Sequence, residues 1–191
     1  QIKGFTSACT MYVNNAYGQG LSEQFAESFE ELGGTVTAQV SHATEEQTTY
    51  VSELTQCVEG EPEVLAAISY PEHGGVYVKE ALEGGLIDTF IFCDGTKSPD
   101  MFEALGWDNF EGMSGSAPGA LKVAAGTAFT AGYEAEWGEK PAMPFMRESY
   151  DAVYVIALAA QKAGSTDATA IRDALRDIAN PPGEVVNPGV A

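Results

Sequence analysis

Short apolar runs alternate with segments of helical periodicity over the first 118 residues of the chain. The apolar runs predict five strands, at 7–15, 35–40, 63–69, 89–93 and 110–117. The segments between them predict helices, at 20–34, 44–60, 72–85 and 98–105. Strands separated by such helices need crossover connections, which make neighbouring strands parallel and cover both faces of the sheet. The sequence therefore predicts an α/β fold, a doubly wound parallel sheet with strand order 2-1-3-4-5.

The pattern changes after residue 118. Three helices are predicted in succession, at 119–138, 144–164 and 166–180, and no strand separates the last two. A proline-rich tail follows at 181–191. We therefore expect residues 1–118 to form an α/β sandwich, and residues 119–191 to form a helical segment that belongs to another lobe of a larger, two-lobed protein.

The chain carries 28 acidic and only 9 basic side chains. Because phosphate binding needs clustered Lys and Arg, we expect no nucleic acid partner. The acid excess fits either solubility in a salty habitat or attraction of a cationic ligand group, and the second needs a positioned carboxylate. No apolar stretch approaches the roughly 20 residues of a membrane span, so we expect none. No charged segment with an apolar core opens the sequence, and we expect a signal peptide to have been removed.

Motifs of enzymes and cofactor sites are incomplete in this sequence. Gly18-Gln19-Gly20 is similar to the start of GxGxxG, but Glu23 stands at the third glycine position. Asp94-Gly95-Thr96 is similar to a phosphatase aspartate loop, but Phe92 stands where a second Asp belongs. The nucleophile elbow GxSxG, the P-loop and HExxH do not occur. We therefore predict that the protein is not an enzyme and binds no cofactor and no metal.

Cysteines and histidines give few further constraints. Cys9, Cys57 and Cys93 match no metal-ligand spacing. In an extracytoplasmic chain two of them can pair, and Cys9 and Cys57 would meet if the strand start and the helix end lie at the same end of the sheet; the sequence leaves this open. Cys93 is expected to be a small buried residue rather than a nucleophile. His42 and His73 lie in polar, turn-like segments and are expected at the surface.

Three predicted strands are each followed by one distinctive side chain, namely Tyr17, Tyr70 and Asp94. Ligands of parallel sheets bind outside the carboxyl ends of the strands. Pro71 forces Tyr70 toward an extended backbone, which projects its ring from the strand end. Taken singly, Tyr17 can fill a turn, Tyr70 can cover a helix end and Asp94 can form an Asx turn. Together, two phenol rings and a carboxylate suit a ligand with an ammonium group and an apolar side chain.

Three segments resemble the Leu/Ile/Val-binding family, in the order that the family has them: "YVNNAYGQGLSEQFAESFEELGGTV", "ISYPEHGGVYVKEALEGGLIDTFIFCDG" and "ESYDAVYVIALAAQKAGSTDATAIRDALRDIANPPGEVVNPG". The members of this family are substrate-binding subunits of ABC importers for branched-chain amino acids, with the type I periplasmic binding fold. The resemblance implies that residues 1–118 are the second lobe, and that residues 119–191 cross toward an incomplete first lobe.

The same resemblance implies ligand-binding roles for Tyr17, Tyr70 and Asp94. Leucine and isoleucine binders of the family usually have Glu at the last position, and the shorter Asp94 leaves the ligand open among amino acids and aromatic or amide analogues. Tyr150 falls where the family places an aromatic residue of the first lobe near the hinge. It can equally be a core residue of an apolar helix.

As a function, the resemblance implies the periplasmic solute-binding component of an ABC importer, which works by hinge closure and has an ABC permease as its partner. A ligand-sensing regulatory receptor of the same fold is the alternative, and an enzyme of an unrecognised class is a second one. The hydroxyl groups with which the first lobe of the family grips the ligand carboxylate have no counterpart here. We therefore expect this chain to bind ligand weakly or not at all.

Overall fold

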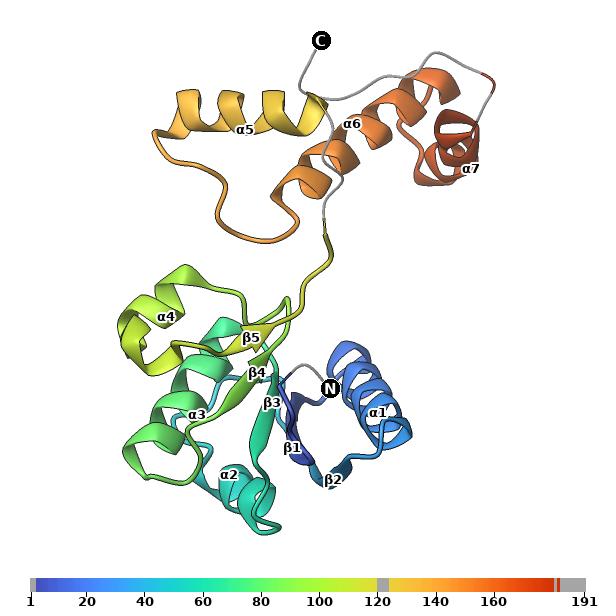
Figure 1. Cartoon of the computed structure of the whole chain (residues 1–191). Helices are drawn as coiled ribbons and strands as arrows, with labels where there is room; N and C mark the ends of the chain where they lie inside the picture. The colour runs from blue at the N-terminus through green and yellow to red at the C-terminus, as the bar shows by residue number, and fades with distance from the viewer. Residues whose placement is uncertain (1–2, 120–123, 181, 183–191) are drawn as a thin grey trace. The chain divides into compact units, whose positions relative to one another are not determined.

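The computed structural model of the chain describes residues 3–119, 124–180 and 182. It divides into two compact units, Gln1–Pro118 and Gly119–Ala191. Each unit is described by itself below (Figure 1).

The first unit is built on one parallel sheet. Its strands are β1 (Ser7–Val13), β2 (Thr35–His42), β3 (Val64–Ile68), β4 (Phe90–Phe92) and β5 (Ser114–Gly115). They lie in the order β2-β1-β3-β4-β5, and every neighbouring pair is parallel. All five residues of β3 are buried, as expected for a central strand that is covered on both faces. The predicted α/β class and strand order are confirmed.

Helices cover both faces of this sheet. Helix α1 (Ala16–Glu31) lies on one face, and α2 (Val51–Val58) and α3 (Pro71–Glu83) lie on the other (Figure 1). Helix α4 (Pro99–Leu105) and the short 3₁₀ helix η1 (Trp107–Phe110) connect β4 to β5. The main apolar core lies under α2 and α3 and joins side chains of β1, β3 and β4 to both helices. The order of strands and helices thus brings the carboxyl ends of β1, β3 and β4 side by side.

Helix α2 is shorter than predicted, because it begins at Val51 rather than near Thr44. The buried Tyr50 holds the preceding segment in an irregular conformation. Its hydroxyl accepts a hydrogen bond from the Gln47 backbone N–H at 3.1 Å and contacts His73 Nδ1 at 2.7 Å. Its own backbone N–H donates to the Glu80 carboxylate at 2.7 Å. These tertiary contacts outweigh the helical pattern that the sequence shows before residue 51.

The second unit contains α5 (Ala124–Trp137), α6 (Met146–Ala163) and α7 (Ala168–Ala179). Helix α6 ends at Gly164, whose φ of 61° is left-handed and favours glycine. Helix α7 begins where the Asp167 side chain accepts hydrogen bonds from the N–H groups of Thr169 and Ala170, both at 3.0 Å. These helices lie within the predicted ranges. The predicted tail falls outside the described residues except for Pro182, as do the predicted helical residues 120–123.

Helix α6 carries large apolar side chains on its surface. Val153 is 65% exposed and Ile156 is 52% exposed. Within the described part of the chain, no helix has the length and the hydropathy that crossing a membrane requires.

Candidate functional site

Tyr17 lies in the first turn of α1, directly after β1. The helix begins at Ala16, so the predicted helix start at residue 20 is wrong. The reason is local: the Asn15 side chain accepts a hydrogen bond from the Gly18 N–H at 2.9 Å and caps the helix. A Cβ at position 18 would collide with the Val13 carbonyl, so glycine allows the helix to begin this close to the strand.

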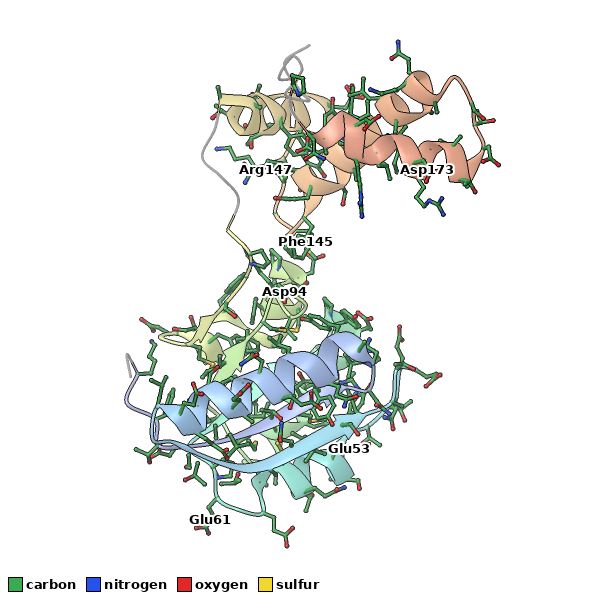
Figure 2. All side chains as sticks on the ribbon, turned by 90° about the vertical axis from the view of Figure 1, so that its right-hand side faces the viewer. Glu53, Glu61, Asp94, Phe145, Arg147 and Asp173 are labelled. Carbon is green, nitrogen blue, oxygen red and sulfur yellow. The ribbon has the colours of Figure 1, made fainter. Side chains whose placement is uncertain are left out.

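The Tyr17 hydroxyl reaches from α1 to the loop after β4. It donates a hydrogen bond to Asp94 Oδ1 at 2.9 Å and accepts one from the Gly95 N–H at 3.3 Å. It also lies 3.1 Å from Cys93 Sγ. Asp94 follows β4 at the strand-end edge of the sheet (Figure 2). One phenol therefore links the first turn of α1 with the loop that follows β4.

Tyr70 joins the same cluster from the end of β3. It has extended backbone angles, φ −114° and ψ 164°, as predicted from the following Pro71, and it is the N-cap residue of α3. Its ring stacks on that of Tyr17, with centroids 5.6 Å apart and an interplanar angle of 16°. Its hydroxyl accepts a hydrogen bond from Asn15 Nδ2 at 3.3 Å. The two rings stack directly on each other, so they form one aromatic wall rather than the two sides of a slot.

The Tyr17 phenol is a neutral hydrogen-bond donor at physiological pH. Burial raises its pKa above the ordinary value, and the hydrogen bonds with Cys93 and Asp94 raise it further. Among the described residues, Tyr17 is the side chain that donates to the Asp94 carboxylate. Asp94 itself is only partly buried, so its remaining lone pairs are open to a further donor.

Gly95 makes the close approach of these loops possible. A Cβ at this position would lie 2.8 Å from the Tyr17 hydroxyl oxygen and would collide with the Ser69 carbonyl. Any larger residue would push the Asp94 loop away from the end of β3. The Gly after Asp94 therefore has a packing role in addition to its place in a turn.

Two histidines that were expected at the surface are buried behind Tyr70. His42 and His73 are each 2% exposed, so that prediction is wrong. Their rings lie 4.9 Å apart, and the His73 ring lies 6.4 Å from that of Tyr70. The sequence signal that was missed is on α3, where His73, Tyr77 and Ala81 follow one another at helical spacing and are all buried.

Hydrogen bonds fix the buried histidines in one arrangement. His42 Nδ1 lies 2.8 Å from the Ala43 carbonyl, and its Nε2 lies 2.8 Å from the Ser69 hydroxyl. A carbonyl can only accept, so Nδ1 carries the proton and Nε2 of the neutral ring accepts from Ser69. Burial lowers the pKa of His42 and keeps the ring neutral. The two buried histidines thus hold together the ends of β2 and β3, next to Tyr70.

Tyr150 belongs to the second unit, on α6. Its hydroxyl donates to that of Tyr154 at 3.1 Å, and its ring lies 5.3 Å from that of Phe129. The side chain is partly buried among these aromatic residues. A ligand-binding role for Tyr150 stays a prediction.

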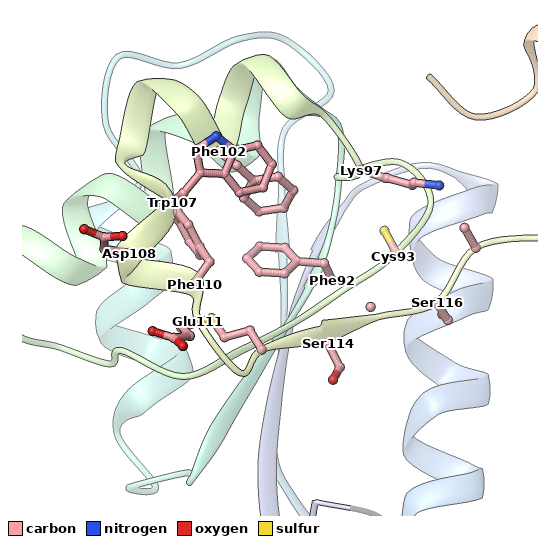
Figure 3. Close-up of a pocket in the computed structure, with 13 residues that line it drawn as sticks. Phe92, Cys93, Lys97, Phe102, Trp107, Asp108, Phe110, Glu111, Ser114 and Ser116 are labelled. Atoms are coloured by element: carbon pink, nitrogen blue, oxygen red, sulfur yellow. The ribbon is translucent and has the colours of Figure 1, made fainter. Parts of the chain in front are cut away.

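An apolar hollow of about 810 Å³ lies beside the cluster, between β4, β5, α4 and η1. Figure 3 shows the rings of Phe92, Phe102, Trp107 and Phe110 gathered around it. Cys93 lines the hollow and also contacts Tyr17, so the two features share one residue. As predicted, Cys93 is buried.

The cluster offers a partly exposed carboxylate beside an aromatic wall. Such a surface can neutralise an ammonium group and pack an apolar body next to it. Within the described ranges, no group of three or more His, Cys, Asp or Glu side chains is arranged to hold a metal ion. The geometry is suited to binding a small molecule.

Comparison with known families gives one match that spans most of the chain. The family described as "Periplasmic binding protein" matches residues 1–184. No curated protein matches the sequence.

Solved structures share the fold. A leucine binding protein, LivK, from Thermotoga maritima is 24% identical, with a TM-score of 0.74, and the match covers 92% of this chain and 50% of that one. A type 1 periplasmic binding protein from Bordetella pertussis is 20% identical, with a TM-score of 0.75 and coverages of 91% and 50%. LivJ from Streptococcus pneumoniae, solved with isoleucine, is 21% identical, with a TM-score of 0.68 and coverages of 90% and 48%. The chain thus spans about half the length of these structures.

Proposed function

The chain belongs to the periplasmic binding protein family, and from this premise we propose that it is part of the extracytoplasmic solute-binding component of an ABC importer. In this proposal it holds an amino acid or a related small compound at the carboxyl edge of its sheet. The observation that carries the proposal is the meeting of Tyr17, Tyr70 and Asp94, which follow the ends of three separate strands.

Asp94 would receive the ammonium group of the ligand. Its carboxylate already accepts from Tyr17 at 2.9 Å, and this bond holds it in one orientation before a ligand arrives. A charge-assisted hydrogen bond from an ammonium group is about twice as strong as a neutral one. Tyr17 thus positions the carboxylate, and Asp94 supplies the charge.

The stacked rings of Tyr17 and Tyr70 would pack against the body of the ligand. With centroids 5.6 Å apart, they leave no room for a group between them, so the ligand lies against their common edge. Isoleucine in the related LivJ structure supports an amino acid as the ligand class. Asp94 is one methylene shorter than a Glu, so its carboxylate leaves space for a larger ligand body or a bridging water.

Hinge closure would complete the site. Since the chain spans half the length of its structural relatives, the other contacts to the ligand would come from the first lobe. A ligand that touches both lobes stabilises the closed state by its differential affinity, and a permease would recognise that closed shape. Tyr150, near the hinge by resemblance, is our candidate for a contact from outside the first unit.

The test is a thermal-shift screen of amino acids and aromatic acids on the complete protein, followed by calorimetry of the best ligand with Asp94→Asn. Loss of the charge should weaken the binding of an ammonium-bearing ligand by about thirtyfold or more, since losing one partner of a charged pair costs about 2 kcal/mol or more.

Asp88→Asn is the matched control, because Asp88 is an exposed carboxylate that precedes β4 at its opposite end. It should leave the affinity within twofold of the unmodified protein. Equal affinities of the Asp94 and Asp88 variants would remove Asp94 from the site.

A further inference from the structure

Two of the three cysteines lie on the same face of the sheet. Side chains alternate along β1, and Thr10 faces α1, where its hydroxyl lies 2.7 Å from that of Ser22. Cys9 therefore faces the other side of the sheet, where it belongs to one buried cluster with side chains of α2 and α3. Cys57, in the last turn of α2, packs into the same buried cluster as Cys9.

The Cys57 thiol lies against β1, beside Cys9. Cys57 Sγ lies 3.6 Å from the carbonyl oxygen of Thr10, the residue next to Cys9 in β1. The hydrogen bond to the Cys9 thiol, followed by burial, raises the pKa of the Cys57 thiol. Both residues are 0% exposed. Cys93 lies elsewhere, with its Sγ 3.4 Å from the Ala67 carbonyl, so it is not a third member of this pair.

We propose that Cys9 and Cys57 are partners in a disulfide bond that forms while the chain folds in an oxidising compartment. The geometry does not depend on any ligand. Only the cellular setting rests on the extracytoplasmic location proposed above, since disulfides persist outside the reducing cytoplasm.

The reaction needs an oxidant, and a small-molecule disulfide such as oxidised glutathione is sufficient. The thiolate of one cysteine attacks this disulfide, a mixed disulfide forms and one glutathione thiol leaves. The second cysteine attacks the protein sulfur of the mixed disulfide, so that the Cys9–Cys57 bond forms and the second glutathione thiol leaves. Two protein thiols are oxidised, and one oxidant disulfide is reduced to two thiols.

Burial determines when this exchange takes place. A buried thiol of raised pKa is rarely a thiolate, so the folded, reduced protein should react slowly. The unfolded chain exposes both thiols to the oxidant, and they become shielded only once α2 has packed on β1. Oxidation during refolding should therefore be fast and oxidation after folding slow.

The disulfide bond would link the short helix α2 covalently to β1. Helix α2 has eight residues, and the side chain of its N-cap residue, Tyr50, makes no capping hydrogen bond. A helix this short depends on packing rather than on its own propensity. The bond would close a long loop between β1 and α2, which restricts the unfolded chain and raises the melting temperature.

The experiment refolds the reduced 191-residue chain with a mixture of reduced and oxidised glutathione, then alkylates free thiols in denaturant and maps peptides by mass spectrometry. The expected result is one cross-linked peptide pair containing Cys9 and Cys57, with Cys93 alkylated. Reduction should lower the melting temperature by roughly 5–15 °C. Three alkylated cysteines, or a cross-link that contains Cys93, would overturn the proposal.

Single cysteine variants distinguish a specific Cys9–Cys57 disulfide bond from nonspecific oxidation of thiols. Cys93→Ser should keep the cross-link, and Cys57→Ser should abolish it and leave Cys9 alkylated. If Cys57→Ser fails to fold, the peptide map of the unmodified chain still decides the question. None of these measurements uses ligand affinity, so a negative result here leaves the proposed function untouched, and the reverse also holds.

Discussion

The hydrogen bond between Tyr17 and Asp94 should make a measurable contribution to the stability of the first unit. Tyr17→Phe keeps the ring that stacks on Tyr70 and removes the hydroxyl that donates to Asp94 Oδ1 at 2.9 Å. It also removes the acceptor of the Gly95 N–H. The substitution therefore removes a single oxygen atom and leaves the stacked rings of Tyr17 and Tyr70 in place.

The magnitude follows from the type and exposure of the bond. A hydrogen bond to a charged group contributes about 1.5–3 kcal/mol. Tyr17, Asp94 and Gly95 are all partly exposed, so water replaces part of what is lost. We expect the free energy of unfolding to fall by about 1–2 kcal/mol, whereas Tyr12→Phe, which alters a hydroxyl on β1 outside the site, should change it by less than about 0.5 kcal/mol.

A double-mutant cycle with Tyr17→Phe and Asp94→Ala tests whether this loss of stability comes from the interaction of the two side chains. The free energy of unfolding of each variant is measured by urea denaturation at neutral pH, with circular dichroism as the signal. Residues in direct contact show coupling energies of about 0.5–3 kcal/mol, and we expect about 1 kcal/mol here. Additive single-variant losses, with a coupling energy near zero, would refute the reasoning that Tyr17 positions Asp94.

Three further results are expected. Gly95→Ala should destabilise the first unit by about 1–3 kcal/mol by overpacking against Ser69, whereas Gly20→Ala, in an open helical position, should stabilise it by about 0.5–1 kcal/mol in the same urea assay. Burial lowers the pKa of His42, so the contribution of the neutral ring to stability is present above pH 6.5 and is lost as the pH falls through the lower folded-state pKa. Urea titrations at several pH values should show this loss of stability, and His42→Asn should make the loss smaller. Calorimetry of the 191-residue chain alone should show no low-micromolar binding of any amino acid, and such binding would contradict the need for the first lobe.

The sequence predicts the sheet well because its signals are local and strong. Apolar runs such as β3 alternate with segments of helical periodicity, and a parallel sheet covered by helices is the arrangement that buries the apolar side chains of both. The predicted strand order is confirmed. The extended backbone of Tyr70 follows from Pro71 in the same way. The positions of Tyr17, Tyr70 and Asp94 at one edge therefore follow from topology alone.

The structural details that the sequence did not predict depend on contacts between residues that are far apart in the sequence. His42 is buried through a hydrogen bond to Ser69, and α2 begins late because Tyr50 is bound to His73 and Glu80. Polar residues of this kind are expected at the surface unless their partners are known. The stacking of the two tyrosines could not be foreseen either, because it depends on how closely α1 approaches the end of β3.

The most direct test of the account is a crystal structure of the complete protein with the ligand that the thermal-shift screen selects. We predict that the ammonium group of the ligand lies within hydrogen-bond distance of the Asp94 carboxylate, about 2.7–3.2 Å, and that its body packs against Tyr17 and Tyr70. A ligand bound elsewhere, with the Asp94 carboxylate facing only solvent and Tyr17, would contradict the account.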